Sequence, residues 1–169
     1  EAFSHAVYQA DLAISITDPD ANILFANEAF SRVTGYGTDA IVGQNESVLS
    51  NHTTPPELYR EMWEHLTTRR PWSGRLLNKR KDGDLYLAEL TISPVADADG
   101  KVSHYVGMHR DITALHRLER MVRNQKEVIE SVIDAAPVAF ALLDISGKVI
   151  LDNQEYKKLV TDLGQKEPA

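Results

Sequence analysis

Cysteine is absent from this sequence of 169 residues. Its absence excludes disulfide bonds, thiolate metal sites, iron–sulfur clusters and cysteine nucleophiles. Positive charge is scarce as well: the net charge is −7, which argues against direct nucleic-acid binding. The sequence also has no apolar run near the roughly 20 residues of a membrane span and no signal peptide at its start. These features favour a cytoplasmic protein without membrane contact.

Motifs of common enzymes and metal sites are missing too. The six histidines do not pair at metal-ligand spacing, so we expect no metal site. Neither a Ser/His/Asp signature nor a glycine-rich phosphate loop is present, and we expect no enzymatic activity. What is present, 43% hydrophobic and 25% charged residues, is typical of a folded globular protein. The chain begins at Glu1 rather than methionine, and we interpret it as a fragment of a longer protein.

Short elements alternate along the first two thirds of the chain. Residues 1–12 have a helix-forming composition. Two alternating apolar segments joined by Pro-Asp-Ala-Asn predict a β-hairpin over 14–27. A short helix closed by glycines is predicted over 28–37, and a longer amphipathic helix over 55–70.

Three further strands are predicted after these helices. Residues 72–80 and 85–95 are joined by Lys-Asp-Gly-Asp, a strong hairpin signal, and 101–113 forms the last strand. Two strands, several helices and three strands predict one antiparallel five-stranded sheet with helices on one face. The fold class is therefore α+β.

From Thr113 onward the sequence follows a heptad repeat. Its a and d positions are Leu115, Leu118, Val122, Gln125, Ile129, Val132 and Ala136. A single amphipathic helix lying on its own domain would show a similar pattern. The polar Gln125 on the seam favours a coiled-coil linker helix over 113–136 that forms a parallel dimer.

The last part of the chain repeats the first hairpin. Residues 139–156 align with 13–30 at a fixed offset, which matches Asp144 to Asp18 and Asn153 to Asn27. Residues 137–169 are therefore predicted to be the truncated start of a second, similar domain.

Several segments together resemble a PAS domain: ITDPDANILFAN, the TGY turn, the NKRKDGDLYL hairpin and the GMHRDIT ending. The resemblance covers essentially the whole chain. It implies a sensory PAS domain over 1–112, whose five-stranded antiparallel sheet covers a cavity for a cofactor or ligand. A coiled-coil signalling helix over 113–136 and the start of a second PAS domain over 137–169 would follow.

A narrower resemblance is to the NifL-type family of nitrogen fixation regulatory proteins. It is carried by the order and spacing of ISITD, ANILFAN, GQNESVLSN, TTPPELY, PWSG, LYLAELT, GMHRD and NQKEVIESV. This resemblance implies FAD in the first PAS domain, with FMN as the alternative, and a response to oxygen and redox state. It also implies control of a transcriptional activator of the NifA type by protein contact. We expect a homodimer formed through residues 113–136 and the N-terminal helix.

The segment GQNESVLS occupies the place of the cysteine motif of flavin-binding LOV photosensors. Glu46 stands where their reactive cysteine would be, so the resemblance implies redox sensing rather than adduct photochemistry. Asn78 matches the first strand asparagine that contacts the flavin, whereas Ala88 replaces the second. His109 replaces a glutamine, and Ser47 replaces the arginine that would hold a phosphate.

Glu46 is the principal candidate residue. A solvated acid at a helix start is the plainer interpretation. Within a PAS cavity its pKa should be raised by desolvation, and Ser15 would relay to Glu46 or directly to the flavin ring. Asn78 would pair with the flavin pyrimidine, and Trp63 would stack on the isoalloxazine or adenine ring or donate its indole N–H. The other expected cavity residues are Thr17, Asn45, Ser47, Leu49, Leu90, Ile92 and His109.

Two alternative functions remain open from the sequence. A haem-binding PAS oxygen sensor would use His65, on the helix predicted over 55–70, as an axial ligand. A cofactor-free PAS module would only dimerise and relay a signal.

Overall fold

A computed structural model describes residues 12–164 of the chain. The helix expected over residues 1–12, with its part in a dimer, lies outside the described residues apart from Leu12. The chain divides into two compact units, Glu1–His116 and Arg117–Ala169.

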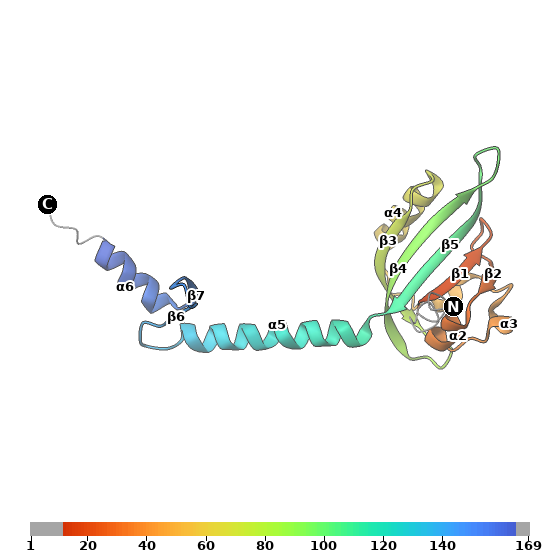
Figure 1. The fold of residues 1–169 in the computed structure, drawn as a ribbon. Helices are drawn as coiled ribbons and strands as arrows, with labels where there is room; N and C mark the ends of the chain where they lie inside the picture. The colour runs from red at the N-terminus through yellow and green to blue at the C-terminus, as the bar shows by residue number, and fades with distance from the viewer. Residues whose placement is uncertain (1–11, 165–169) are drawn as a thin grey trace. The chain divides into compact units, whose positions relative to one another are not determined.

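The first unit contains the predicted five-stranded antiparallel sheet (Figure 1). The strands are β1 (Ala13–Thr17), β2 (Ile23–Ala26), β3 (Trp72–Lys79), β4 (Leu85–Ala96) and β5 (Val102–Asp111). Their order in the sheet is β2-β1-β5-β4-β3, and every neighbouring pair is antiparallel. β5, the last of these five strands in sequence, therefore lies in the centre of the sheet and joins the β1–β2 and β3–β4 hairpins.

Four short helical elements separate the second and third strands. They are α2 (Glu28–Thr34), α3 (Thr38–Ile41), the 3₁₀ helix η1 (Glu46–Leu49) and α4 (Pro56–Thr67). Gly35 ends α2 in the left-handed conformation, with φ of 79°. The longest of these helices, α4, ends at Thr67, three residues before the predicted end at residue 70. The reason is local: Arg69 has φ of 60°, which a continuing α-helix does not allow.

Alternation along β1 and β5 sets which side chains face the helices. Ser15 pairs with Gly107, and Thr17 pairs with Tyr105. Ser15, Thr17, Tyr105 and His109 are all buried. Side chains two residues apart on a strand share a face, so this face of the sheet carries polar groups into the interior.

Two hydrophobic clusters hold the helices to the sheet. Phe30, from α2, lies in one cluster together with Tyr86 of β4. Met62 and Leu66, from α4, lie in the other together with Trp72 of β3. Because Met62 and Leu66 are four residues apart, they lie on one face of α4 and fix its position against the strands.

The second unit repeats the beginning of the first at the level of hydrogen bonds. It contains β6 (Ala141–Leu143), β7 (Val149–Asp152) and α6 (Gln154–Gly164). Asn27 caps α2 by accepting from the N–H groups of Ile14 and Phe30. Asn153 accepts in the same way from the N–H groups of Phe140 and Tyr156.

The heptad segment forms one helix, α5 (Thr113–Asp134), which begins in the first unit and continues into the second. Ala136, predicted as the last seam residue, lies beyond its end. The apolar seam is solvent-exposed, with Leu118 at 58% and Val132 at 66%. Among residues 12–164, no helix is long and apolar enough to cross a membrane.

Candidate functional site

A cavity of about 560 Å³ lies in the first unit, between the inner face of the sheet and the segments η1 and α4. Its volume is in the range of small-molecule sites, which is about 300–1,000 Å³. Every residue that the sequence predicted as a cofactor contact lines it: Ser15, Thr17, Asn45, Glu46, Ser47, Leu49, Trp63, Asn78, Leu90, Ile92 and His109. The structure thus brings the whole predicted set together, and their roles toward a ligand stay predictions.

The Glu46 carboxyl group is bound directly to the sheet. The Ser15 hydroxyl of β1 donates a hydrogen bond of 2.5 Å to Oε1 of Glu46. Burial raises the pKa of Glu46, and the hydrogen bond from Ser15 opposes that shift. A carboxyl group whose pKa is raised beside a cavity is suited to holding or releasing a proton.

The position of Glu46 follows from the turn that precedes it. Asn45 caps η1, because its Oδ1 accepts from the Ser47 N–H at 3.1 Å. The Asn45 side-chain N–H group donates to the Asp20 carbonyl at 2.9 Å, and the Glu46 N–H donates to the Ala21 carbonyl at 2.9 Å. Asn45 therefore anchors η1 to the first hairpin and directs Glu46 towards Ser15.

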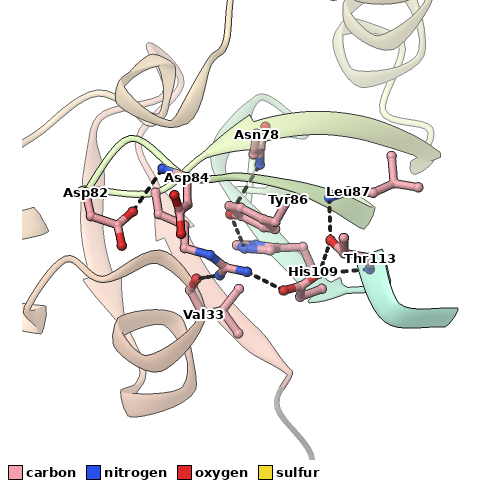
Figure 2. A network of polar contacts seen from close by, with 10 residues as sticks. Val33, Asn78, Asp82, Asp84, Tyr86, Leu87, His109 and Thr113 are labelled. Atoms are coloured by element: carbon pink, nitrogen blue, oxygen red, sulfur yellow. Dashed lines mark hydrogen bonds and ion pairs between the residues drawn. The ribbon is translucent and has the colours of Figure 1, made fainter. Parts of the chain in front are cut away.

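A second polar group connects the cavity to the interior of the sheet. Asn78 Nδ2 donates to the Tyr86 hydroxyl at 3.4 Å, and this hydroxyl lies 3.1 Å from Nε2 of His109 (Figure 2). Burial lowers the pKa of His109 to about 4, so its imidazole is neutral at pH 7. The Asn78 amide retains a second N–H and a carbonyl oxygen that a ligand can pair with.

The remaining walls are apolar and aromatic. Leu49, Leu90 and Ile92 line the cavity as predicted. Trp63 is 37% exposed, and its ring makes an edge contact with Tyr105 at 5.8 Å between centroids. Aromatic walls of this kind suit a flat ligand ring.

Sequence reasoning did not name several residues of the site. Tyr105 and Gly107 precede His109 by four and two positions on β5, so strand periodicity alone would have placed them beside it. Tyr59 precedes Trp63 by four positions on α4, where helical periodicity gives the same indication. Tyr86, which lies outside the cavity lining, shares a face of β4 with Leu90 and Ile92 by the same periodicity, but its hydrogen-bond partners Asn78 and His109 come from β3 and β5.

The His65 side chain does not belong to the site. It is absent from the cavity lining, and its Nδ1 donates to the Glu61 carbonyl at 2.9 Å within α4. An axial haem ligand would have to point into the cavity. In the part of the chain that the structure describes, no group of three or more acidic or histidine side chains could hold a metal ion.

Comparison with known proteins identifies a matching family model and a similar full-length protein. The family model described as "PAS fold" matches residues 1–112. A nitrogen fixation regulatory protein of Klebsiella oxytoca is 43% identical over 98% of this chain. The match covers 33% of that protein, so the chain spans about a third of the length of this relative.

Two solved structures share the fold with similar sequences. An RNA-binding light-oxygen-voltage receptor is 28% identical, with a TM-score of 0.62 over 75% of this chain and 36% of the receptor chain. A light-oxygen-voltage domain studied with a flavin analogue is 25% identical, with a TM-score of 0.59 over 75% of this chain and 96% of that domain.

Proposed function

This chain belongs to the PAS family, and from that premise we propose that it is a redox-sensing module that binds a flavin in the cavity. The observation that carries the proposal is the Ser15–Glu46 pair, a proton-holding carboxyl group inside a partly apolar cavity. The similarity to a nitrogen fixation regulatory protein and to a light-oxygen-voltage domain studied with a flavin analogue supports the same class of ligand.

The residues of the cavity fit a flavin ring system. Asn78 offers a donor and an acceptor side by side, which suits the alternating carbonyl and N–H groups of the pyrimidine edge. Leu49, Leu90 and Ile92 offer apolar walls, and Trp63 offers an aromatic face. No described residue that lines the cavity is Lys or Arg. A phosphate would therefore be held by neutral donors such as Ser47, as expected from the missing arginine.

When bound, a flavin supplies two-electron redox chemistry and a ring nitrogen whose protonation follows its oxidation state. The chain's own residues handle the proton. Glu46 holds it when protonated, and the Ser15 hydroxyl stabilises the carboxylate when the proton has left. A change of charge at Glu46 would then alter its hydrogen bond to Ser15 and so act on η1, which contains Glu46, and on β1, which contains Ser15.

The finer parts of the proposal follow the predicted organisation. The PAS domain occupies residues 1–112, residues 113–136 relay its state through a dimeric coiled coil, and 137–169 begin a second PAS domain. The repeated asparagine caps at Asn27 and Asn153 support the last assignment. The cofactor is FAD, and the module controls a transcriptional activator of nitrogen fixation, of the NifA type, in response to oxygen.

An absorption spectrum of the purified chain tests the ligand class. We expect the two visible bands of an oxidised flavin, bleached by dithionite, and release of FAD rather than FMN on denaturation, identified by mass spectrometry. A Soret band would replace the proposal by a haem sensor, and a colourless protein by a cofactor-free module.

The role of Glu46 is tested by Glu46→Gln, which keeps the shape and removes the titration. We expect the variant to retain its flavin, while the redox-dependent change in oligomer packing, followed by small-angle scattering, is strongly reduced. Glu28→Gln, at an exposed position of α2, is the matched control and should respond like the parent. A Glu46→Gln protein that responds to dithionite as the parent does would exclude Glu46 as the relay.

A further inference from the structure

Tyr86 occupies a position between the cavity and the first turn of α5. Its side chain is fully buried on β4 and does not itself line the cavity. Its hydroxyl accepts from Asn78 and lies 3.1 Å from His109 Nε2, and both partners do line the cavity. Burial raises the pKa of Tyr86 to about 12, so the phenol stays protonated beside the neutral imidazole. The hydroxyl therefore has two hydrogen-bond partners, Asn78 and His109.

The ring of Tyr86 contacts a second group, the guanidinium of Arg80. The Cζ atom of Arg80 lies 4.4 Å from the ring centroid, a cation–π contact. The same guanidinium donates to the Val33 carbonyl at the end of α2 and to Oδ2 of Asp111 at the end of β5 (Figure 2). The Tyr86 ring thus supports the side chain that holds Asp111.

Asp111 and Leu87, the residue after Tyr86, together hold the start of α5 in place. Oδ1 of Asp111 accepts from the Thr113 N–H at 2.9 Å and from the Thr113 hydroxyl at 2.5 Å. The Thr113 hydroxyl oxygen in turn accepts from the Leu87 N–H at 2.9 Å, and the Leu87 carbonyl accepts from the Ile112 N–H at 2.9 Å. Tyr86 therefore reaches the first turn of α5 by two routes, through Arg80 and through the backbone of Leu87.

We propose that Tyr86 is the positioning residue that couples the hydrogen bonding of the cavity to the start of α5; this proposal rests on the proposed flavin-sensing function. A buried hydroxyl depends on its two protein partners, so in this proposal a change in the hydrogen bonds of Asn78 or His109 shifts the phenol. That movement changes the contact between the Tyr86 ring and Arg80, and it shifts the backbone of Leu87, which bonds to Thr113. The first turn of α5 then exchanges between two hydrogen-bonded arrangements.

Tyr86→Phe tests the coupling, because it removes the hydroxyl and keeps the ring beneath Arg80. The flavin-bound chain is compared before and after dithionite by hydrogen exchange of the Thr113 and Leu87 amides. In the parent we expect reduction to change these exchange rates by about fivefold or more, the lower range of common coupling between sites. In Tyr86→Phe the flavin spectrum remains and the change falls below about twofold. Tyr36→Phe, a half-buried tyrosine away from the cavity lining, keeps the parental change.

A second measurement needs no flavin and keeps the test independent of the proposed function. In the cofactor-free chain, Tyr86→Phe and Arg80→Lys should each raise the exchange rate at Thr113. The double variant should exceed Arg80→Lys by less than the single effect of Tyr86→Phe, because part of the effect of Tyr86 passes through Arg80 and only the remainder passes through Leu87. If the parent protein binds no flavin, the proposed function is wrong, but the comparison of Thr113 exchange rates between the variants still tests the role of Tyr86. Fully additive effects, or a Tyr86→Phe protein with the parental redox change, would overturn the coupling role of Tyr86.

Discussion

Glu46 and His109 line the same cavity, and burial shifts the pKa of each so that its neutral form is favoured. For Glu46 the pKa is raised, and for His109 it is lowered to about 4. The consequences for stability have opposite signs. The unfolded chain loses the Glu46 proton first as pH rises, and it gains the His109 proton first as pH falls. Ionisation of Glu46 therefore lowers the stability of the folded chain as pH rises, and protonation of His109 lowers it as pH falls.

The contribution of His109 can be measured by substitution. Its pKa is about 4 in the folded chain against an ordinary value of 6.5, so the folded state loses stability as pH falls from 6.5 to 4. Relative to His109→Gln, the parent should lose on the order of 3 kcal/mol of unfolding free energy over this interval. Urea unfolding of both proteins at several pH values gives the difference directly.

The control for that experiment is His52→Asn. His52 is an exposed residue with φ of 58°, a conformation that asparagine also adopts. This variant leaves His109 in place, so it should keep the loss of stability between pH 6.5 and 4 that the parent shows. A His109→Gln protein whose profile also follows the parent would mean that His109 titrates normally in the folded chain.

Gly107 leaves the space in which Ser15 meets Glu46. A Cβ atom at Gly107 would lie 3.0 Å from the Ser15 hydroxyl oxygen, closer than ordinary contacts. Gly107→Ala should therefore displace the hydroxyl and weaken its bond to Glu46. Because that bond lowers the pKa of Glu46, the pKa should rise further. Carboxyl carbon chemical shifts of labelled glutamate, followed against pH, measure the direction.

Ser15→Ala should raise the Glu46 pKa in the same direction, since it removes the hydroxyl itself. Ser73→Ala removes a strand serine whose hydroxyl pairs with Thr91 at 3.1 Å instead, and should leave the titration of Glu46 in place. A downward shift in Gly107→Ala would show that Ser15 is not displaced from the carboxylate.

At the scale of elements, the two asparagine caps are the clearest repeated device. Asn27 accepts from two backbone N–H groups and donates to the Leu12 carbonyl at 3.0 Å. Asn153 makes the corresponding bonds and donates to the carbonyls of Val138 and Ile133. One side chain thus joins the hairpin to the following helix in each unit.

Removing a cap should loosen its own unit only. Asn27→Ala should destabilise the first unit by about 1–3 kcal/mol, because buried backbone groups lose their partner. Asn153→Ala should raise the exchange rate of the Tyr156 amide and leave the Phe30 amide unchanged. Residue-resolved hydrogen exchange distinguishes the two variants. Asn27→Asp keeps the acceptor oxygen and should lose less stability than Asn27→Ala.

At the scale of the whole molecule, α5 presents an apolar seam without a partner in the described chain. Val122 and Ile129 are 60% and 53% exposed. A seam of this regularity is typical of helices that pair with a second copy. If α5 forms the proposed dimer, Val122→Glu should weaken association by about tenfold or more, equivalent to roughly 1.4 kcal/mol.

Sedimentation velocity over a range of protein concentrations measures this shift. Arg120→Glu, which changes charge on the opposite side of the heptad, serves as the control and should associate like the parent. Unchanged association in Val122→Glu would place the dimer contact elsewhere than on α5.

Local chemistry made most of this architecture predictable. Asp82 and Gly83 predicted the turn between β3 and β4, and the alternation around Ser15 and His109 predicted which face of the sheet lines the cavity. The resemblance to known families added the role of Glu46. The end of α4 was missed because it depends on the backbone at Arg69. Tyr86 was missed because its partners lie on β3 and β5, and strand register across a sheet is not written in any one segment.

The central place of β5 has a consequence for biosynthesis. Ala13 of β1 pairs with His109, and within the described sheet the two hairpins are joined through β5. A nascent chain on the ribosome therefore carries two separate hairpins until this strand emerges, and long-range pairing of this kind forms slowly. Gly107 and His109 arrive with it, so the cavity closes at the end of translation of the domain. Any ligand must be captured after that moment, just as α5 begins to appear.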